Sequence, residues 1–349
     1  MIANITIVFP TFNRGKLLLN TIKKMEQESF NNVEVLVLDN ASENYTKEYK
    51  EIKNISLRKK WLKYIRHQKN RGFEGNILAG FDNCNTNYLM FISDEDYPNF
   101  GFLEKHQNLF NNARIYGAIR PSIGLDGESE SRKPINAFTY PDEYFKKGVS
   151  AIGRFGLTGN YLSGVIYNKV IFDKYGFRER LASNLGIQRF YPHLYLNCLF
   201  CAVSRTIFMK DASAFEGIPE IVEIDGIKQN DSSSYRGAYT FGARLDQFIA
   251  LRNAISEALE LGNFNDPLDL LNLYLNLVAK FFHLIVLANG RLYHNQHKIH
   301  VINIAKSFTE FATSSIRLYP AFQNNEEKIV KRIEELEKSF LDRIAFKSN

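Results

Sequence analysis

The stretch Leu89–Pro98, LMFISDEDYP, decides the fold that we expect for this chain. Its opening run of four apolar residues, LMFI, is typical of a strand buried on both faces of a parallel sheet. Three acids follow after Ser93, namely Asp94, Glu95 and Asp96, and acids enter a core only with partners or a metal. We therefore expect all three to face solvent at the strand's carboxyl end, where open α/β sheets bind their ligands.

Clustered carboxylates at a strand end suggest a hard cation, Mg²⁺ or Mn²⁺, shared with a phosphorylated substrate. The alternative is an ordinary acidic turn between a strand and a helix, with Asp96 as the helix cap. The stretch by itself leaves both interpretations open, so the segments around it have to decide.

Two earlier segments predict neighbouring strands. Ile5–Phe9 (ITIVF) and Val33–Leu38 (VEVLVL) are apolar, and the segment LLLNTIKKMEQ between them has helical spacing. This βαβ pattern predicts a parallel pair with a right-handed crossover, and Tyr64–Arg66 predicts a third strand. Polar residues after each strand then lie on one sheet edge, in an α/β fold with a mostly parallel sheet flanked by helices.

The composition suits a large globular chain with an anionic partner. The chain has 349 residues, of which 45% are hydrophobic, and a formal net charge of +6. We predict an α/β domain over residues 1–240 and a helical subdomain over residues 241–349. The apolar segment of the second domain is interrupted by Asn272, Asn276, Lys280 and His283, which argues against a membrane span.

The cysteines and the amino terminus favour a reducing compartment. Three cysteines give no disulfide framework, and Cys198 and Cys201 lie in an apolar run that predicts a buried helix face. The segment MIANITIVFP has no basic n-region and no cleavage site, so we predict no signal peptide. A cytoplasmic location fits these features.

Four short motifs lie at the ends of the predicted strands or open the following helices. In chain order they are Pro10-Thr11-Phe12-Asn13-Arg14, Asp39-Asn40-Ala41-Ser42, Asn70-Arg71-Gly72 with Asn76, and Asp94-Glu95-Asp96. In this order the set resembles the family 2 glycosyltransferases, whose α/β fold is called GT-A. The resemblance covers roughly the first 100 residues well and extends loosely to about residue 210.

The resemblance implies a nucleotide-sugar donor, a divalent metal and a role for each motif. The loop Pro10–Arg14 is expected around the base and ribose, with Arg14 near a phosphate. Asp39 is expected to accept a hydrogen bond from a pyrimidine N–H. The further residues that the resemblance places along the nucleotide are Asn70, Arg71, Gly72, Asn76, Asp94 and Glu95. The metal ligands that it implies are Asp94 and Asp96.

Several of these residues also have ordinary structural interpretations. Asp39 fits a turn, Asn70 fits a left-handed backbone position, and Arg14 fits a solvated surface charge. The set as a whole, in order and at strand ends, favours the functional interpretation.

The chain departs from the family where the catalytic base is expected. The family usually carries a Glu-Asp pair there, whereas residues 186–193 read GIQRFYPH, without a carboxylate. His193 is the nearest titratable group and suits general-base work, although an ordinary packed histidine is an equal alternative. The rival carboxylates are Asp173, Glu179, Asp211 and Asp225. Ser93 replaces a usual first acid, which brings the chain nearer to abequosyltransferase-like enzymes of O-antigen synthesis.

The expected reaction is sugar transfer from a nucleotide donor to a hydroxyl of a surface-glycan acceptor, with inversion at the anomeric carbon. The alternatives are a catalytically inactive nucleotide- or glycan-binding module and a nucleotidyltransferase. The expected acceptor is a glycan or lipid-linked glycan, and no nucleic-acid partner is expected. The helical subdomain is expected to contact the inner membrane surface, and the alternative is a plain helical subdomain that packs on the catalytic core or on a second subunit as a homodimer.

Overall fold

The computed structural model describes most of the chain. The described residues are 4–27, 33–111, 115–125, 139–159, 161–187, 191–217, 221–224, 227–230, 241–292, 298–317, 322 and 325–346. Contacts between Cα atoms group the chain into two compact units. The first comprises Met1–Glu223 and Lys228–Arg236, and the second comprises Ile224–Ile227 and Gly237–Asn349. The domain boundary at residues 240 and 241 stays a prediction.

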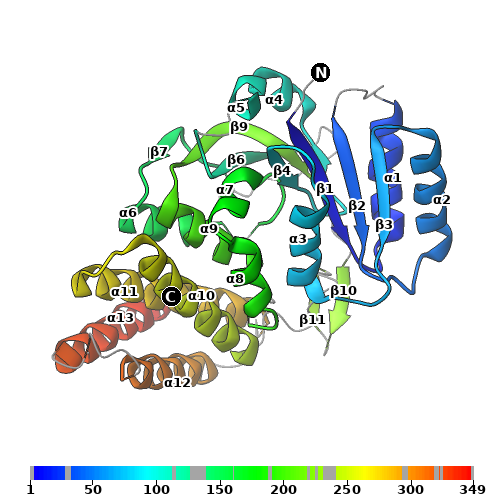
Figure 1. The fold of residues 1–349 in the computed structure, drawn as a ribbon. Helices are drawn as coiled ribbons and strands as arrows, with labels where there is room; N and C mark the ends of the chain where they lie inside the picture. The colour runs from blue at the N-terminus through cyan, green and yellow to red at the C-terminus, as the bar shows by residue number, and fades with distance from the viewer. Residues whose placement is uncertain are drawn as a thin grey trace. The chain divides into compact units, whose positions relative to one another are not determined.

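The first unit is built on a mixed sheet (Figure 1). Its strands are β1 (Ile5–Thr11), β2 (Glu34–Asp39), β3 (Leu62–Arg66), β4 (Tyr88–Phe91), β5 (Tyr97–Pro98), β6 (Ala118–Leu125), β7 (Glu143–Phe145), β8 (Ile166–Asn168) and β9 (Thr206–Glu216). Across the described residues the strand order is β3-β2-β1-β4-β8-β6-β9-β5, with β7 paired to β9. Strands β1 to β4 pair in parallel, which confirms the predicted α/β fold.

Helices connect and cover these strands. They are α1 (Gly15–Gln27), α2 (Thr46–Arg58), α3 (Gly72–Asn83), α4 (Phe100–Lys105), α5 (Gln107–Asn111), α6 (Val149–Ala151), the π-helix η3 (Ile152–Gly156), α7 (Lys169–Lys174), α8 (Phe177–Ser183) and α9 (Pro192–Val203). The predicted buried face with Cys198 and Cys201 lies in α9, where both thiols are buried.

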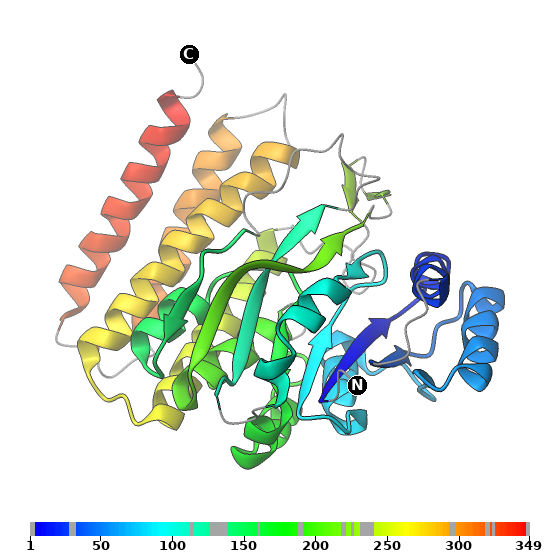
Figure 2. The ribbon, with the colours of Figure 1, turned by 90° about the horizontal axis from the view of Figure 1, so that it is seen from above.

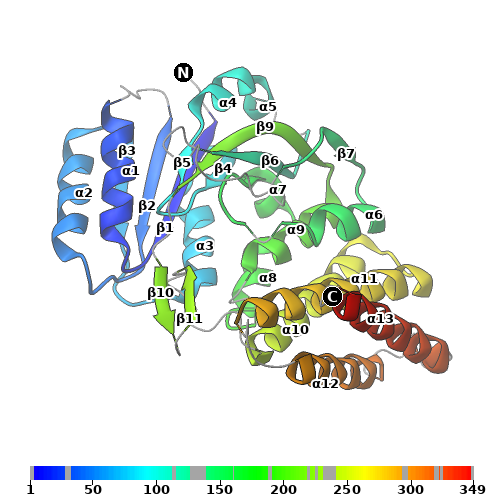
Figure 3. The same ribbon diagram turned by 180° about the vertical axis from the view of Figure 1, so that it is seen from behind.

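The alternation of side chains along β1 explains why helices cover both faces of the sheet. Ile5, Ile7 and Phe9 point to one face and pack in a single core with apolar residues of α1 and α2. Val8 points to the other face, where Gly80 of α3 packs closely against it. Seen from behind, α1 and α2 lie together beside β1–β3, and α3 lies apart from them (Figure 3).

The half of the sheet beyond β4 differs from the prediction. A strand was expected over residues 162–167, but β8 begins only at Ile166, and it runs antiparallel to β4. Residues 162–165 instead form a turn in which Ser163 and Gly164 make side-chain and backbone contacts with the end of β4. This half is completed by β6 and β9, which pair in parallel.

The second unit is helical, as predicted. A separate two-stranded sheet, most of whose residues belong to the first unit, pairs β10 (Ile221–Ile224) with β11 (Ile227–Asn230). The helices are α10 (Phe241–Gly262), α11 (Pro267–Leu292), α12 (Lys298–Ile316) and α13 (Glu326–Phe346), which Figure 2 shows as long helices packed together. Phe248 lies at their centre, with edge-on ring contacts to Tyr274, Phe281 and Phe308.

The polar interruptions of α11 lie on its outer face. Asn272, Asn276 and His283 are exposed, whereas Tyr274 is buried and donates to the Ala312 carbonyl at 2.6 Å. Among the described residues, no helix has the length and apolarity that crossing a membrane requires.

Candidate functional site

The carboxyl ends of β1, β2 and β3 place three polar side chains in one row. The register pairs Thr11 with Asp39 and Asp39 with Arg66. The first motif was expected to lie in a loop, but β1 extends through Pro10 and Thr11 because both still pair with β2. The row therefore lies at the sheet edge where the sequence predicts ligand binding.

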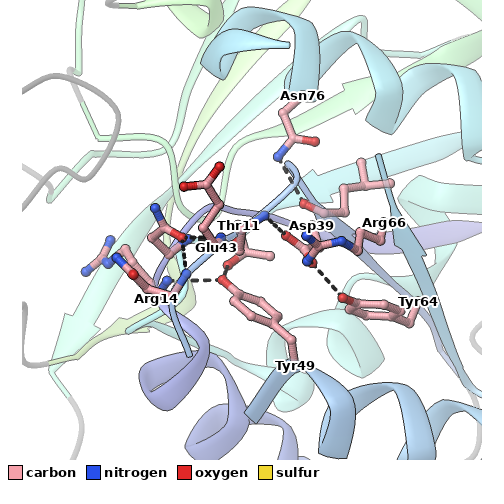
Figure 4. A network of polar contacts seen from close by, with 12 residues as sticks. Thr11, Arg14, Asp39, Glu43, Tyr49, Tyr64, Arg66 and Asn76 are labelled. Carbon is pink, nitrogen blue, oxygen red and sulfur yellow. Dashed lines mark hydrogen bonds and ion pairs between the residues drawn. The ribbon is translucent and has the colours of Figure 1, made fainter. Parts of the chain in front are cut away.

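The first and second motifs hold each other in place (Figure 4). Asn13 has a left-handed backbone (φ 57°), and its Oδ1 accepts from the amides of Glu43 and Asn44 at 2.8 and 2.9 Å. The Asn13 amide donates to Ser42 Oγ at 2.8 Å. Non-glycine residues with positive φ cost conformational energy and collect at functional sites, and Ala41 (φ 63°) is a second one here.

Tyr49 of α2 holds the first motif in place through hydrogen bonds of its hydroxyl. Its hydroxyl lies 2.6 Å from Thr11 Oγ1 and accepts from the Arg14 amide at 3.0 Å. Burial, followed by the charge of Asp94, raises the pKa of the Tyr49 phenol well above its ordinary value, so the hydroxyl stays protonated. Tyr49 was not predicted from the sequence as a site residue.

Asp39 is fully buried and is oriented by three donors (Figure 4). Its Oδ1 accepts from the Ser42 amide at 2.8 Å, and its Oδ2 accepts from Tyr64 Oη at 2.6 Å and Arg66 Nη1 at 3.0 Å. Burial and then Asp39 raise the pKa of the Tyr64 phenol. Tyr64 and Arg66 were missed as site residues, although their i, i+2 spacing in a predicted strand puts them on one face.

The third motif ties its loop to β2. Asn40 Nδ2 donates to Asn70 Oδ1 at 2.9 Å and to the Gly72 carbonyl at 3.0 Å, and Asn40 Oδ1 accepts from the Arg71 amide at 2.9 Å. Gly72 has φ +75°, a conformation that suits glycine. Asn70 caps this turn by accepting from the Gly72 amide at 2.8 Å.

Asn76 connects α3 to the end of β2. Its Nδ2 donates to the Leu38 carbonyl at 3.0 Å, next to Asp39, and its Oδ1 lies 3.1 Å from His67 Nε2. Burial lowers the pKa of the His67 imidazole. Asn76 therefore positions the strand end that carries Asp39, and His67, which sequence reasoning missed, positions Asn76.

Asp94 and Glu95 meet the guanidinium of Arg14 after β4. Arg14 Nη1 lies 3.8 Å from Asp94 Oδ2, and Arg14 Nη2 lies 3.0 Å from Glu95 Oε2. Burial raises the pKa of the Asp94 carboxyl to about 7, against the lowering effect of Arg14. The alternative of a solvated surface charge is thus wrong for Arg14, which is 6% exposed.

The expectation that all three acids face solvent is wrong for Asp94, which is 4% exposed, and for Asp96, which is fully buried. Its Oδ1 accepts from Tyr161 Oη at 2.8 Å and from the Gly217 amide at 2.9 Å, and its Oδ2 accepts from Ser163 Oγ at 2.5 Å. These donors replace water, so the carboxylate tolerates burial. We call Asp96, Tyr161, Ser163 and Gly217 the Asp96 cluster. Burial and then the charge of Glu95 raise the pKa of Asp96.

The acids fit a divalent cation that is shared with a substrate. The part of the chain that the structure describes contains no group of three or more His, Cys, Asp or Glu side chains placed to hold a metal. Asp94 Oδ1, however, is buried without a hydrogen-bond partner, next to the Glu95 carboxylate. Two carboxylates that leave other positions to phosphate oxygens and water are a usual arrangement for Mg²⁺.

His193 lies in the first turn of α9 and is 2% exposed. Its carbonyl accepts from Tyr167 Oη at 2.9 Å, and its ring meets Tyr191 edge-on. Residues 188–190, just before it, lie outside the described residues. The role of His193 as the base stays a prediction.

The rival carboxylates have other contacts or lie outside the described residues. Asp173 pairs with Lys169 at 2.6 Å, and Asp211 accepts from Lys105 and His106, each at 2.7 Å. The hydrogen bonds from Lys105 and His106 lower the pKa of Asp211. Glu179 lies in the first turn of α8, and Asp225 is not among the described residues.

This chain is similar to known proteins in sequence and in fold. Residues 6–176 match the family model described as Glycosyl transferase family 2. The GalNAc(5)-diNAcBac-PP-undecaprenol beta-1,3-glucosyltransferase of Campylobacter jejuni is 28% identical in a match of 156 residues that covers 40% of this chain and 50% of that protein. The chain thus matches about half the length of this curated relative.

Solved structures of S. aureus TarS 1–349 resemble the fold over nearly the whole chain. The crystal structure has a TM-score of 0.56 at 15% identity and covers 97% of this chain and 91% of its own. The complex with UDP-GlcNAc covers the same shares at 15% identity, with a TM-score of 0.58. At this identity the likeness concerns the fold alone.

Proposed function

We propose that this chain, whose residues 6–176 match the family model described as Glycosyl transferase family 2, moves a sugar from a nucleotide-sugar donor to a hydroxyl of a surface glycan. The narrower resemblance to abequosyltransferase-like enzymes, which rests on Ser93 and the three acids after it, is part of this proposal. So is a lipid-linked form of the acceptor, since the Campylobacter relative is named for an undecaprenol-linked substrate.

One observation supports the proposal most strongly: the four motifs contact one another in a single chain of polar contacts. Arg14 of the first motif pairs with Glu95 of the fourth. Asn13 of the first motif joins Ser42 of the second. Asn40 of the second motif joins Asn70 of the third. Motifs dispersed over more than 80 residues would not converge on one sheet edge if each were an unrelated turn.

The donor half of the site fits a nucleoside diphosphate. Each carboxylate oxygen has two acceptor positions, so Asp39 can accept from a base N–H while Tyr64 and Arg66 hold its orientation. Residues Thr11 to Arg14, at the end of β1 and after it, then border the ribose, and the backbone at Gly72 permits close approach of the nucleotide.

Asp94 and Glu95 would hold a divalent metal, Mg²⁺ or Mn²⁺, on the diphosphate. When bound, the metal supplies positive charge that stabilises the nucleoside diphosphate as it leaves. Asp96 as a metal ligand remains a prediction, and its three hydrogen bonds favour a supporting role instead. His193 is proposed to take the proton of the acceptor hydroxyl in a single in-line displacement with inversion.

Donor binding tests the proposal directly. In a thermal-shift panel of UDP-, CDP-, GDP- and dTDP-sugars, with and without Mn²⁺, one donor with Mn²⁺ should stabilise the protein by about 2.7 kcal/mol at 100 times its dissociation constant. Asp39→Asn should weaken that binding roughly tenfold or more, because a charge-assisted hydrogen bond is lost. No stabilisation by any donor would contradict the proposal, and an unchanged affinity in Asp39→Asn would make Asp39 a turn residue only.

A second candidate function is an inactive binding module, which residues 186–193 favour because no carboxylate occurs there. Slow hydrolysis of the donor in the presence of Mn²⁺ would distinguish an active glycosyltransferase from an inactive module, since a glycosyltransferase commonly transfers some sugar to water. Donor binding without any hydrolysis or transfer would favour the module.

A membrane-surface location of the second unit is a further part of the proposal. Lys280, Lys298 and Lys306 are basic residues of α11 and α12. Co-sedimentation with anionic liposomes at low salt, lost at high salt, is the expected result, because salt screens surface attraction. Absence of co-sedimentation at low salt would leave these helices as a packing or homodimer surface.

A further inference from the structure

The guanidinium of Arg14 lies against both acids that the proposed function assigns to the metal. It is 3.8 Å from Asp94 and 3.0 Å from Glu95, and the three side chains are only 7%, 5% and 12% exposed. Two carboxylates so close together repel each other, and burial strengthens that repulsion. The positive charge of Arg14 offsets most of the repulsion between the two carboxylates.

The backbone of Arg14 is fixed, whereas its side chain is long. The Arg14 amide donates to Tyr49 Oη at 3.0 Å, and the Arg14 carbonyl accepts from the Leu18 amide at 3.2 Å in the first turn of α1. The position of the chain therefore does not have to change for the guanidinium to move. A planar fork also suits contact with two carboxylates better than the point charge of a lysine.

A divalent cation on Asp94 and Glu95 would lie next to this guanidinium. Like charges a few ångströms apart in a partly buried site repel strongly. The metal and Arg14 are thus alternative partners of the same two carboxylates. The phosphates of a nucleotide offer Arg14 another anionic partner of the kind that guanidinium groups bind well.

We propose that Arg14 is the counter-ion of Asp94 and Glu95 as long as no nucleotide is bound. It then competes with the divalent metal for the two carboxylates, until the phosphates of a nucleoside diphosphate bind its guanidinium instead. The proposal rests on the proposed function, in which these acids hold the metal. Its consequence is that metal and nucleotide bind cooperatively. The nucleotide removes the Arg14 guanidinium from the carboxylates, and the metal replaces Arg14 there and leaves it free to bind phosphate. Metal alone then binds weakly.

Binding of Mn²⁺ alone to the full chain, followed by the electron paramagnetic resonance signal of free Mn²⁺, tests the competition. Arg14→Gln should bind Mn²⁺ roughly tenfold more tightly than the wild type, because a repelling charge is gone. Arg14→Lys keeps the charge without the planar fork, so its Mn²⁺ affinity should lie between those of the wild type and Arg14→Gln. Arg178→Gln, which removes a surface arginine paired with Asp82, is the matched control and should change nothing. Unchanged or weaker binding in Arg14→Gln overturns the proposal.

Addition of UDP as the probe separates this inference from the proposed function. UDP should tighten Mn²⁺ binding in the wild type by a larger factor than in Arg14→Gln. Equal factors in the two proteins overturn the counter-ion role and leave the metal site intact. Absence of Mn²⁺ binding in every variant, with UDP or without it, overturns both.

The fold of Arg14→Gln needs its own measurement, because the variant leaves two neighbouring carboxylates without their counter-ion. Its thermal midpoint without metal should fall below that of the wild type, and Mn²⁺ should raise it by more than it raises the wild-type midpoint. If Arg14→Gln fails to fold, Mn²⁺ binding by Glu95→Gln is measured in its place. This variant removes the nearest partner of Arg14 and one proposed ligand, so it should weaken Mn²⁺ binding, and unchanged binding would overturn the proposal.

Discussion

Asp96→Ala is expected to lower the free energy of unfolding by about 2–4 kcal/mol and to abolish most turnover. The variant leaves three buried donors, Tyr161 Oη, Ser163 Oγ and the Gly217 amide, without their acceptor. Each unsatisfied buried donor costs roughly 1–3 kcal/mol, and removal of a buried carboxylate whose pKa is raised returns part of that. Chemical denaturation of the full chain measures the change.

Asp96→Asn is the matched variant for this experiment. It keeps the shape and one acceptor oxygen, so it should lose clearly less stability than Asp96→Ala. A wild-type denaturation midpoint in Asp96→Ala, together with lost Mn²⁺ binding, would instead identify Asp96 as a metal ligand and refute its structural role.

His193→Ala is expected to lower kcat for transfer by roughly two to four orders of magnitude, the usual effect of a lost general base. Donor affinity should hardly change, because the proposed contact of His193 is with the acceptor hydroxyl. The pH–rate profile should lose its acidic limb, since that limb reports protonation of the base. Steady-state kinetics from pH 5 to 9 measure both effects.

His283→Ala is the control for this substitution, because His283 is exposed on α11 and is assigned no role in the reaction. It should leave kcat unchanged. If His193→Ala lowers only the thermal midpoint while kcat and the pH profile persist, His193 is a packing residue, in keeping with its burial.

The parallel half of the sheet, β1 to β4, could be predicted from local sequence patterns. The apolar runs at Ile5–Phe9 and Val33–Leu38 are long, and each is followed by polar residues, so strand type and edge could be predicted together. Contacts between residues that are distant in sequence could not be predicted in this way. The burial of Asp96 depends on Tyr161, Ser163 and Gly217, none of which its neighbours along the chain indicate.

Other parts of the first unit were predicted less well for a related reason. Residues 162–165 have the apolar composition of a strand, yet Ser163 and Gly164 are needed for contacts with the end of β4, so the strand begins later. Tyr64 and Arg66 were placed in a strand but not in the site, because only the pairing of β2 with β3 reveals that they face Asp39.

The Asp96 cluster also sets an order of events during synthesis on the ribosome. The Asp96–Gly217 hydrogen bond joins residues 121 positions apart. At 5–20 residues per second, roughly ten seconds pass between the emergence of the two partners. Strands β1 to β4 can pair during this interval, whereas the acid-bearing turn after β4 has to wait for the end of β9. A nascent chain would therefore hold the formed edge of β1 to β3 before the Asp96 carboxylate is locked, which delays the completed first unit until β9 has emerged.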